Sequence, residues 1–160
     1  MAATSKSVPS KKSASLPPRW FIRSFWAVQR AAYSATHGRF GLRSARADRW
    51  GMLRLRTVGR RSGKERTAIL GYFEDGADLV TMAMNGWADP EPAWWLNLQA
   101  HPDVTVDLPG GSRAVHARAA NHDERPRLWA IQATYDKDLD DYAARRSGET
   151  AVVILSPRPE

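Results

Sequence analysis

Two turn signals, each flanked by strand-like runs, constrain the fold of this chain more than any other feature of its 160 residues. Glu74-Asp75-Gly76 divides the apolar segment RTAILGYFEDGADLVTMAM, and Asp-Gly between such runs is a strong hairpin signal. Pro109-Gly110-Gly111 divides VTVDLPGGSRAVHARAA in the same way. Because hairpins pair consecutive strands in opposite directions, these segments predict an antiparallel sheet rather than a series of β-α-β units.

The remaining periodic segments add strands and a helix to this sheet. Residues 52–58 (MLRLRTV) alternate like a strand, with Met52 or Leu53 beginning the set of side chains that faces inward. Residues 151–156 (AVVILS) predict a short buried strand, and residues 92–102 have helical spacing between two prolines. The order of elements indicates an α+β domain with an antiparallel, barrel-like sheet of about six strands.

A further helix is predicted in the segment NHDERPRLWAIQATY. Asn121, with Glu124 three residues later, fits a capping box, in which two residues exchange hydrogen bonds at the start of a helix. Pro126 is favoured in the first turn of a helix. The helix is therefore expected to start either at this box or after Asp123.

The positive charge of the chain is concentrated near its N-terminus. The formal net charge is +7; residues 1–49 hold ten basic residues against one acid, whereas residues 50–160 hold fourteen against sixteen. The second part is nearly neutral, so the high pI is poor evidence for nucleic-acid binding by it. We expect a disordered basic tail over residues 1–18, an amphipathic helix and basic linker over residues 19–49, and one globular domain over residues 50–160.

The expected N-terminal helix, RWFIRSFWAVQRAAY, has aromatic and aliphatic side chains on one face and Arg23 and Arg30 on the opposite face. Two interpretations stay open: the helix packs on the domain, or it lies on an anionic membrane surface, where tryptophan and arginine are favoured. No apolar run approaches the roughly 18 residues of a membrane span, and the start of the chain lacks the apolar stretch of a secretory signal. We therefore expect a cytoplasmic protein, attached to the cytoplasmic face of a membrane under the second interpretation.

The segment TVGRRSGKERTA, residues 57–68, is the first candidate for a binding site. Two glycines, four cations and a serine lie within eight of its residues. It does not match a P-loop, because only three residues separate its glycines and Glu65 follows Lys64. The cations and the close backbone approach that glycine permits suit an anion, but a plain hairpin loop with solvated charges is the alternative.

A second dense segment, MAMNGWADPEPAWWLNL, covers residues 82–98 and holds three of the seven tryptophans. These side chains fit either the core of the domain or a flat slot for a planar ring.

GRRSGKERT, the hairpin to EDG and PAWWLNLQAHPDVTV, in this order and spacing, resemble the deazaflavin-dependent nitroreductase family, a branch of the split β-barrel oxidoreductases. That family has a Gly-Arg-x-Ser-Gly-x-x-Arg loop followed by a Trp-x-Leu-Asn-Leu-x-x-x-Pro segment. The resemblance covers roughly residues 50–156. It implies a split β-barrel that binds coenzyme F420, a deazaflavin with a phospholactyl-oligoglutamate tail, which makes residues 50–160 a cofactor-binding domain.

The resemblance also implies a role for particular residues in four parts of the site. They are the anionic-tail residues Arg60, Arg61, Ser62 and Arg66, the strand beside the ring with Thr67, Ala68 and Ile69, the backbone along the ring at Met82, Ala83 and Met84, and the closing helix with Ala93, Trp94, Trp95 and Asn97. Tyr135 matches a tyrosine on the substrate side and is the predicted catalytic residue, whose hydroxyl would polarise a carbonyl or pass a proton. The alternative is that Tyr135 only packs on the substrate and water delivers the proton.

The implied activity is that of an F420H2-dependent reductase, which transfers a hydride from the deazaflavin to an activated double bond in an enone, a quinone or a nitroaromatic. Paired guanidinium groups suit the phosphate and carboxylates of the cofactor tail. Chemistry carried by a cofactor needs no nucleophile from the protein. The alternative is a non-catalytic carrier that uses the same slot for F420 or a lipid-like ligand.

Other classes of partner are not expected. A nucleic-acid partner is disfavoured because residues 50–160 carry more acids than bases and the aromatic residues gather in one segment. The four histidines are scattered without the spacing of metal ligands, so no metal is predicted. The expected partner is a small-molecule hydride acceptor, with the anionic membrane surface as a further partner of the N-terminal helix.

Overall fold

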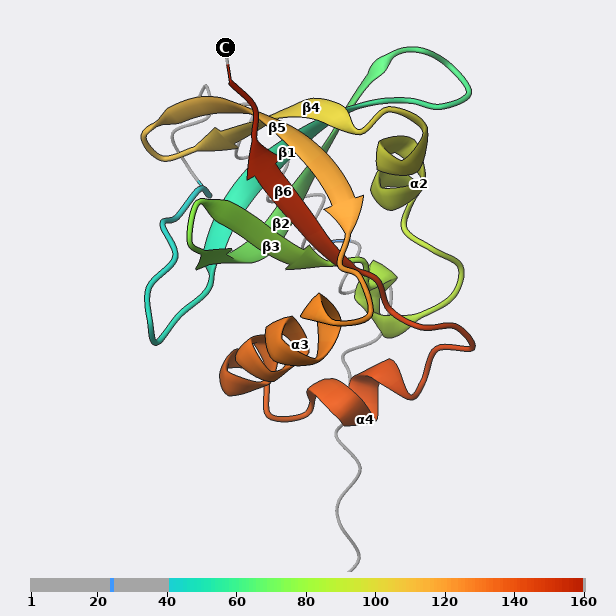
Figure 1. Cartoon of the computed structure of the whole chain (residues 1–160). Coiled ribbons are helices and arrows are strands. Elements are labelled where there is room, and N and C mark those ends of the chain that lie inside the picture. Colours follow the sequence, from blue (N-terminus) through green and yellow to red (C-terminus); the bar gives the residue numbers. More distant parts are fainter. Residues whose placement is uncertain (1–23, 25–40, 160) are drawn as a thin grey trace, which may run out of the picture.

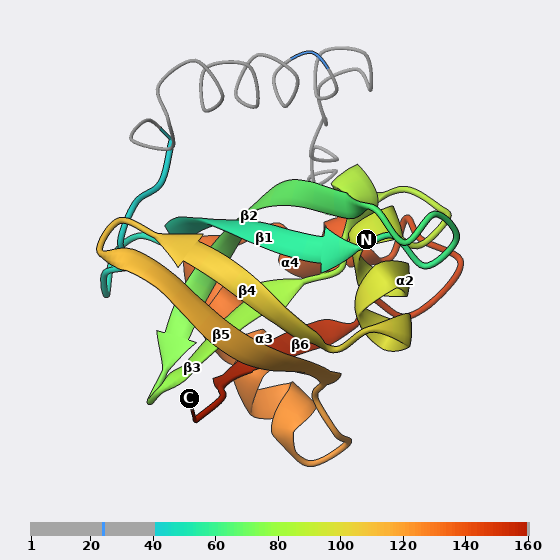
Figure 2. The ribbon, with the colours of Figure 1, turned by 90° about the horizontal axis from the view of Figure 1, so that it is seen from above.

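The structure is a computed structural model that describes Ser24 and residues 41–159. Six strands form a closed barrel in the order β1-β2-β3-β6-β5-β4, and every neighbouring pair is antiparallel (Figures 1 and 2). The strands are β1 (Gly51–Val58), β2 (Glu65–Asp75), β3 (Asp78–Met82), β4 (Asp103–Leu108), β5 (Gly111–Ala119) and β6 (Val152–Pro157). The predicted antiparallel, six-stranded barrel is confirmed.

The interior of the barrel follows from the alternation of apolar residues along each strand. Leu53 and Leu55 of β1 are fully buried, whereas Met52 and Arg54, which alternate with them, lie on the other face of the strand. The inward-facing set of β1 therefore begins at Leu53, which settles the alternative that the sequence left open. Buried residues of the other strands complete this inner core, among them Val106, Val115 and Leu155.

Both predicted hairpins are present. The first joins β2 to β3, with Asp75 opposite Asp78 and Gly76 in the left-handed region at a φ of 63°. The second joins β4 to β5 through Pro109-Gly110, and Leu108 pairs with Gly111. Glycine suits the first turn because a side chain is rarely tolerated at such a φ.

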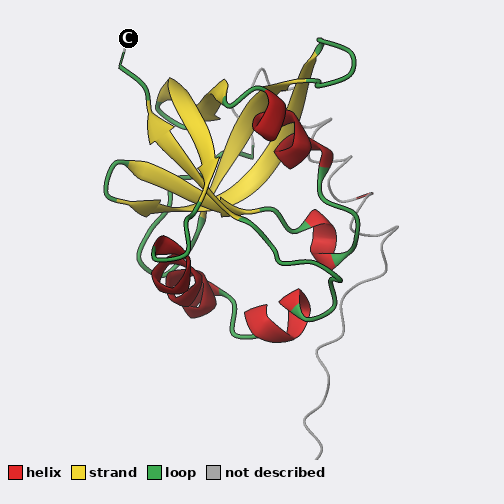
Figure 3. Cartoon of the chain, turned by 45° about the vertical axis from the view of Figure 1, so that its right-hand side comes forward, coloured by secondary structure: helices red, strands yellow, loops and turns green. Residues whose placement is uncertain are grey.

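Helices lie outside the barrel (Figure 3). They are the short 3-10 helix η1 (Asn85–Trp87), α2 (Ala93–Ala100), α3 (Glu124–Tyr135) and α4 (Leu139–Ala143). α3 covers the outer face of β3 and β6, where Leu128 packs with Val80 and Ile154 in a second buried cluster. α2 lies beside the end of β1, at the loop that leads into β2 (Figures 1 and 2). η1 and α4 were not expected from the sequence.

The start of α3 satisfies both expectations for this helix. The side-chain Oδ1 of Asn121 accepts a hydrogen bond of 2.8 Å from the Glu124 amide, and Glu124 Oε2 accepts one of 2.9 Å from the Asn121 amide. The capping box is therefore formed, while the helix itself begins after Asp123.

The N-terminal segments bear on several predictions that the described residues do not test. The helix expected in RWFIRSFWAVQRAAY lies outside the described residues apart from Ser24, and so does the tail over residues 1–18. The division at residues 18 and 49 stays a prediction. Arg43, in the expected linker, exchanges backbone hydrogen bonds with Met52 of β1. In the described part of the chain, no helix has the length and apolar character needed to cross a membrane.

Candidate functional site

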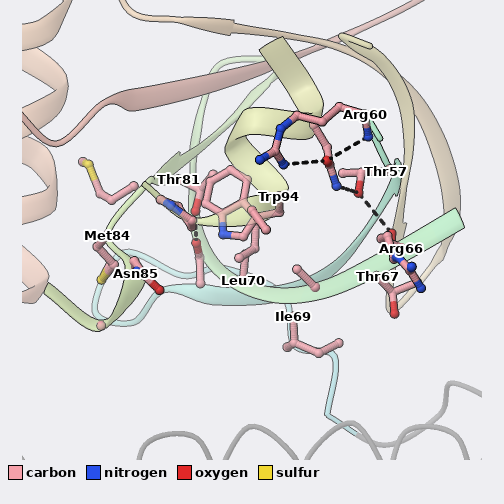
Figure 4. Close-up of a pocket in the computed structure, with 18 of the residues that line it drawn as sticks. Thr57, Arg60, Arg66, Thr67, Ile69, Leu70, Thr81, Met84, Asn85 and Trp94 are labelled. Atoms are coloured by element: carbon pink, nitrogen blue, oxygen red, sulfur yellow. Dashed lines mark hydrogen bonds between the residues drawn. The ribbon is translucent and has the colours of Figure 1, made fainter. Parts of the chain in front are cut away.

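A cavity of about 1210 Å³ lies between the loop before β2, β2 itself, α2 and the segment after β3 (Figure 4). Most of the residues that the resemblance assigns to the cofactor line this cavity. They are Arg60, Arg61, Ser62, Arg66, Thr67, Ala68, Ile69, Met82, Met84, Ala93, Trp94 and Asn97. Segments that are distant in the sequence are therefore brought together as the family motifs imply.

The loop between β1 and β2 forms the cationic end of the cavity. It is closed tightly by hydrogen bonds of 2.8 Å, from the Gly59 amide to the Lys64 carbonyl and from the Gly63 amide to the Gly59 carbonyl. Its cations, Arg60, Arg61, Lys64 and Arg66, are all exposed. Among the described residues, none of these four cations forms an ion pair with an acid. A loop with accessible cations of this kind suits an anionic ligand.

Asn97 of α2 holds this loop in place through hydrogen bonds. Its side chain is 5% exposed, and its Oδ1 accepts hydrogen bonds from the Arg60 amide at 3.1 Å and from Arg60 Nη1 at 3.4 Å. Its Nδ2 donates to Thr57 Oγ1 at 3.2 Å, and Thr57 Oγ1 donates to the Arg66 carbonyl at 3.2 Å. The network joins the end of β1, the start of β2 and α2, and it fixes the position of the Arg60 backbone.

The opposite end of the cavity is less charged. Arg60 and Arg66 lie at one side of the cavity, Met84 and Asn85 lie at the other, and Trp94 lies between them (Figure 4). The half-buried indole of Trp94 offers a flat apolar surface between the two ends, which suits a planar ring. The cavity thus combines an anion-binding end with an apolar end, as a ring with a long anionic tail requires.

Ala83 and Trp95, two residues assigned to the cofactor by the resemblance, do not line the cavity. Ala83 is fully buried and Trp95 is 6% exposed, and both belong to the inner core. Adjacent residues on a helix point about 100° apart, so Trp94 faces the cavity while Trp95 faces the barrel. Likewise Met82 and Met84 flank the cavity, while the Ala83 side chain between them points inward.

Tyr135, the predicted catalytic residue, is also not among the residues that line the cavity, although it packs on the same buried cluster as Met82 and Met84. It is the last residue of α3, its ring stacks on Phe73 with centroids 6.1 Å apart, and it approaches Trp50 at 6.5 Å. Its hydroxyl donates a hydrogen bond of 3.3 Å to the Arg46 carbonyl. In this arrangement Tyr135 packs α3 against the barrel, and its hydroxyl is engaged with the backbone.

The sequence did not single out several residues that the structure places at the cavity. Thr57, Gly71, Thr81 and Asn85 are the clearest examples. Thr57 continues the inward-facing set of β1 next to the glycine loop, so its position could have been inferred from the alternation. The Thr81 hydroxyl donates a hydrogen bond of 2.8 Å to the Gly71 carbonyl. No local pattern in the sequence predicts this contact, because it depends on the register of β2 and β3.

The comparisons with known proteins agree with this geometry. The model of the F420H2-dependent quinone reductase family matches residues 26–157. An F420H2-dependent quinone reductase of Mycobacterium tuberculosis is 33% identical over 131 residues, which cover 80% of this chain and 87% of that protein. A putative F420H2-dependent quinone reductase of Mycobacterium bovis matches with the same figures.

Solved structures support the fold in the same way. A structure of an F420H2-dependent reductase aligns with a TM-score of 0.59 at 24% identity, over 66% of this chain and 93% of that one. A second structure, described as a domain-swapped dimer, aligns with a TM-score of 0.63 at 22% identity, over 88% of this chain and all of that one. At these identities the likeness concerns the fold alone.

Family membership rests on the family model and on the relatives above 30% identity, and it favours the predicted reductase over the predicted carrier. The chain therefore belongs to the F420H2-dependent quinone reductase family, which confirms the predicted F420-dependent oxidoreductase activity and the predicted cofactor, coenzyme F420.

Proposed function

We propose that this protein reduces a quinone in the cavity between β2, α2 and the segment after β3, with Arg60, Arg61 and Arg66 binding the anionic tail of F420H2. The observation that carries the proposal is the polarity of the cavity, with accessible cations at one end and Met84 and Trp94 toward the other. Its volume of about 1210 Å³ exceeds the roughly 300–1,000 Å³ of an ordinary small-molecule site, which supports room for an acceptor beside the cofactor.

When bound, F420H2 supplies a hydride. A quinone that takes up this hydride and one further proton becomes a hydroquinone, so two electrons and two hydrogens are accounted for. The residues of this chain bind and orient the two partners, and Trp94 and Met84 exclude water from the contact between them.

The absence of an acidic group favours a quinone over the other two predicted acceptors. Among the described residues, no carboxylate, histidine or tyrosine lines the cavity. The Thr81 hydroxyl and one N–H of the Asn85 amide already donate to the Gly71 and Pro90 carbonyls, and the second N–H of the amide is no acid. A reduced quinone carries its charge on oxygen, which takes a proton rapidly from water. An enone must be protonated on carbon and a nitro group must lose oxygen, and both steps gain from a positioned acid.

The test is the oxidation of F420H2 under anaerobic conditions, followed by the return of the visible absorbance of F420. We expect menadione, a soluble naphthoquinone, to be reduced with a kcat/KM at least tenfold above that of cyclohexenone or nitrobenzene. Arg60→Ala should raise the KM for F420H2. The matched control is Arg113→Ala, because Arg113 lies by the β2–β3 turn and contacts the Ala77 carbonyl.

Three results would contradict the proposal. A faster reaction with cyclohexenone would make an enone the acceptor. Binding of F420 without any quinone-dependent oxidation above the rate without protein would instead favour the carrier. An equal effect of Arg60→Ala and Arg113→Ala on KM would remove the loop from the cofactor site.

A further inference from the structure

The segment from Met84 to Pro92, which forms the wall of the cavity opposite the cationic loop, has an unusual backbone. Asn85 has a φ of 31° and Trp87 a φ of 61°, both in the left-handed region that residues with side chains seldom adopt. Such residues persist only where the surrounding structure holds them. Met84, Asn85 and Pro92 of this segment line the cavity, so whatever holds the segment also fixes the shape of the site.

One buried arginine holds this segment from the side away from the cavity. The Arg146 side chain is 1% exposed and is not among the residues that line the cavity. Its Nη1 donates to the Ala83 carbonyl at 2.8 Å and to Thr150 Oγ1 at 3.0 Å, and its Nη2 donates to Glu91 Oε1 at 3.0 Å. Arg146 therefore connects both ends of the wall segment to the chain before β6.

Neighbouring contacts reinforce the same attachment. Asp89 Oδ1 lies 3.9 Å from Arg146 Nε, and Asp89 Oδ2 accepts a hydrogen bond of 3.1 Å from the Ser147 amide. The ring of Trp87 stacks on Tyr142 of α4 with centroids 6.0 Å apart. The contacts that the wall segment makes on this side come largely from one stretch, α4 and the residues that follow it.

We propose that Arg146 is a positioning residue for hydride transfer, which sets the wall formed by Met84 and Asn85 through its hydrogen bonds to Ala83 and Glu91. This proposal rests on the use of the cavity by F420H2 and a quinone. Arg146 touches neither ligand, because it lies outside the cavity. The guanidinium suits the task because its planar fork bonds several acceptors at fixed angles, which the single ammonium of a lysine cannot do.

Arg146→Lys is the informative variant because it keeps the charge and removes the fork. We expect hydrogen–deuterium exchange of the hydrogen-bonded amides in residues 84–91, those of Met84 and Trp87, to become at least tenfold faster, with exchange of residues 59–66 unchanged. The matched control is Arg125→Lys. Arg125 donates to the Thr150 carbonyl at 2.6 Å and lies 4.8 Å from the ring centre of Trp129, so it binds the same stretch before β6 but not the wall.

The kinetic readout separates positioning from a general loss of structure. For Arg146→Lys we expect kcat with menadione to fall at least tenfold at saturating F420H2, while the Kd of F420, measured by its fluorescence, changes less than threefold. The cationic loop at the other end is untouched, so it still binds the tail. Arg125→Lys should keep kcat within twofold, even if its melting temperature falls as much as that of Arg146→Lys.

A second variant, Glu91→Gln, keeps the test decisive if Arg146→Lys does not fold. It removes the charge that strengthens the hydrogen bond from Arg146 and leaves the bonds of Arg146 to Ala83 and Thr150, so we expect the same changes at a smaller size, about threefold in exchange and in kcat. The proposal is overturned if Arg146→Lys leaves the exchange of residues 84–91 or the value of kcat unchanged. It is also overturned if Arg125→Lys changes both quantities as much as Arg146→Lys does. Exchange and F420 affinity are measured without turnover, so they still decide the matter if the protein reduces no quinone.

Discussion

Replacing Asn97 with alanine tests whether this buried amide contacts the cofactor or acts through Arg60. Asn97 makes hydrogen bonds of 3.1 and 3.4 Å to Arg60 and one of 3.2 Å to Thr57. A hydrogen bond contributes about 1 kcal/mol net, and the longest of the three contributes less. Thr57 keeps its bond to the Arg66 carbonyl, and water from the cavity can reach the Arg60 amide. We therefore expect the free energy of unfolding to fall by about 2 kcal/mol.

The effect on binding follows from the same contacts. Without Asn97 the Arg60 side chain is ordered only when the anionic tail binds, which costs about 1 kcal/mol. This corresponds to roughly a fivefold increase in the Kd of F420. Arg60→Ala, which removes the charge-assisted contact itself, should cost about 1–3 kcal/mol. Fluorescence titration of F420 at one fixed salt concentration measures both variants.

The double variant distinguishes the two roles of Asn97. If Asn97 acts through Arg60, then adding Asn97→Ala to Arg60→Ala should weaken binding by roughly twofold at most, because the bonds then lost, to the backbone amide of residue 60 and to Thr57, no longer order a cationic side chain. A fivefold loss in both backgrounds would refute this reasoning and make Asn97 a direct contact of the cofactor. Asn121→Ala is the control: it removes a helix cap worth about 1 kcal/mol and should leave the Kd unchanged.

Three further predictions concern other parts of the chain. Tyr135→Phe should keep kcat within twofold, since within the described residues the hydroxyl bonds only a backbone carbonyl; a tenfold fall with unchanged F420 affinity would restore Tyr135 as a catalytic residue. A hydrogen bond from Arg118 helps to lower the pKa of Glu124 from 4.5 to about 2. The ionised Glu124 carboxylate therefore stabilises the folded protein fully above pH 4.5, and this stabilisation is lost as the pH falls toward 2. Urea unfolding should therefore show a weaker pH dependence in that range for Arg118→Gln than for the wild type. For the expected N-terminal helix, Arg23→Glu with Arg30→Glu should abolish sedimentation with anionic vesicles; if the wild type does not sediment at low salt, the membrane interpretation is wrong.

The sequence predicted those parts of the fold that depend on local patterns. The turn at Gly76 requires a left-handed φ, and the exchange between Asn121 and Glu124 needs only residues three apart, so both could be predicted. The closure of the barrel could not, because the pairing of β1 with β4 joins Leu55 to Val106 across half of the described chain. The split-barrel assignment came from the family motifs rather than from periodicity.

The candidate site divides in the same way. The cluster of cations in the loop after β1 is visible in the sequence, because Glu65 is the only acid among them. Three of these cations, Arg60, Arg61 and Arg66, line the cavity. The sequence does not show which of Trp94 and Trp95 faces the cavity, since that depends on the rotation of α2 against the barrel. It also gives no reason to single out Arg146, whose partners Ala83 and Glu91 are 63 and 55 residues away along the chain.

The two ends of the cavity are held by separate polar groups, and this separation makes a further prediction. Asn97 bonds Arg60 and Thr57, whereas Arg146 bonds the backbone of Ala83 and the side chains of Glu91 and Thr150, so the two networks share no partner. Effects at sites without shared partners add to within about 0.5 kcal/mol. Asn97→Ala should therefore act mainly on the affinity for F420 and Arg146→Lys mainly on kcat. The loss in kcat/KM of the double variant should equal the product of the single losses to within about twofold. A larger deviation would mean that α2 and the wall segment move together, and that the anion-binding end and the reacting end of the cavity are coupled through the bound cofactor or through the barrel.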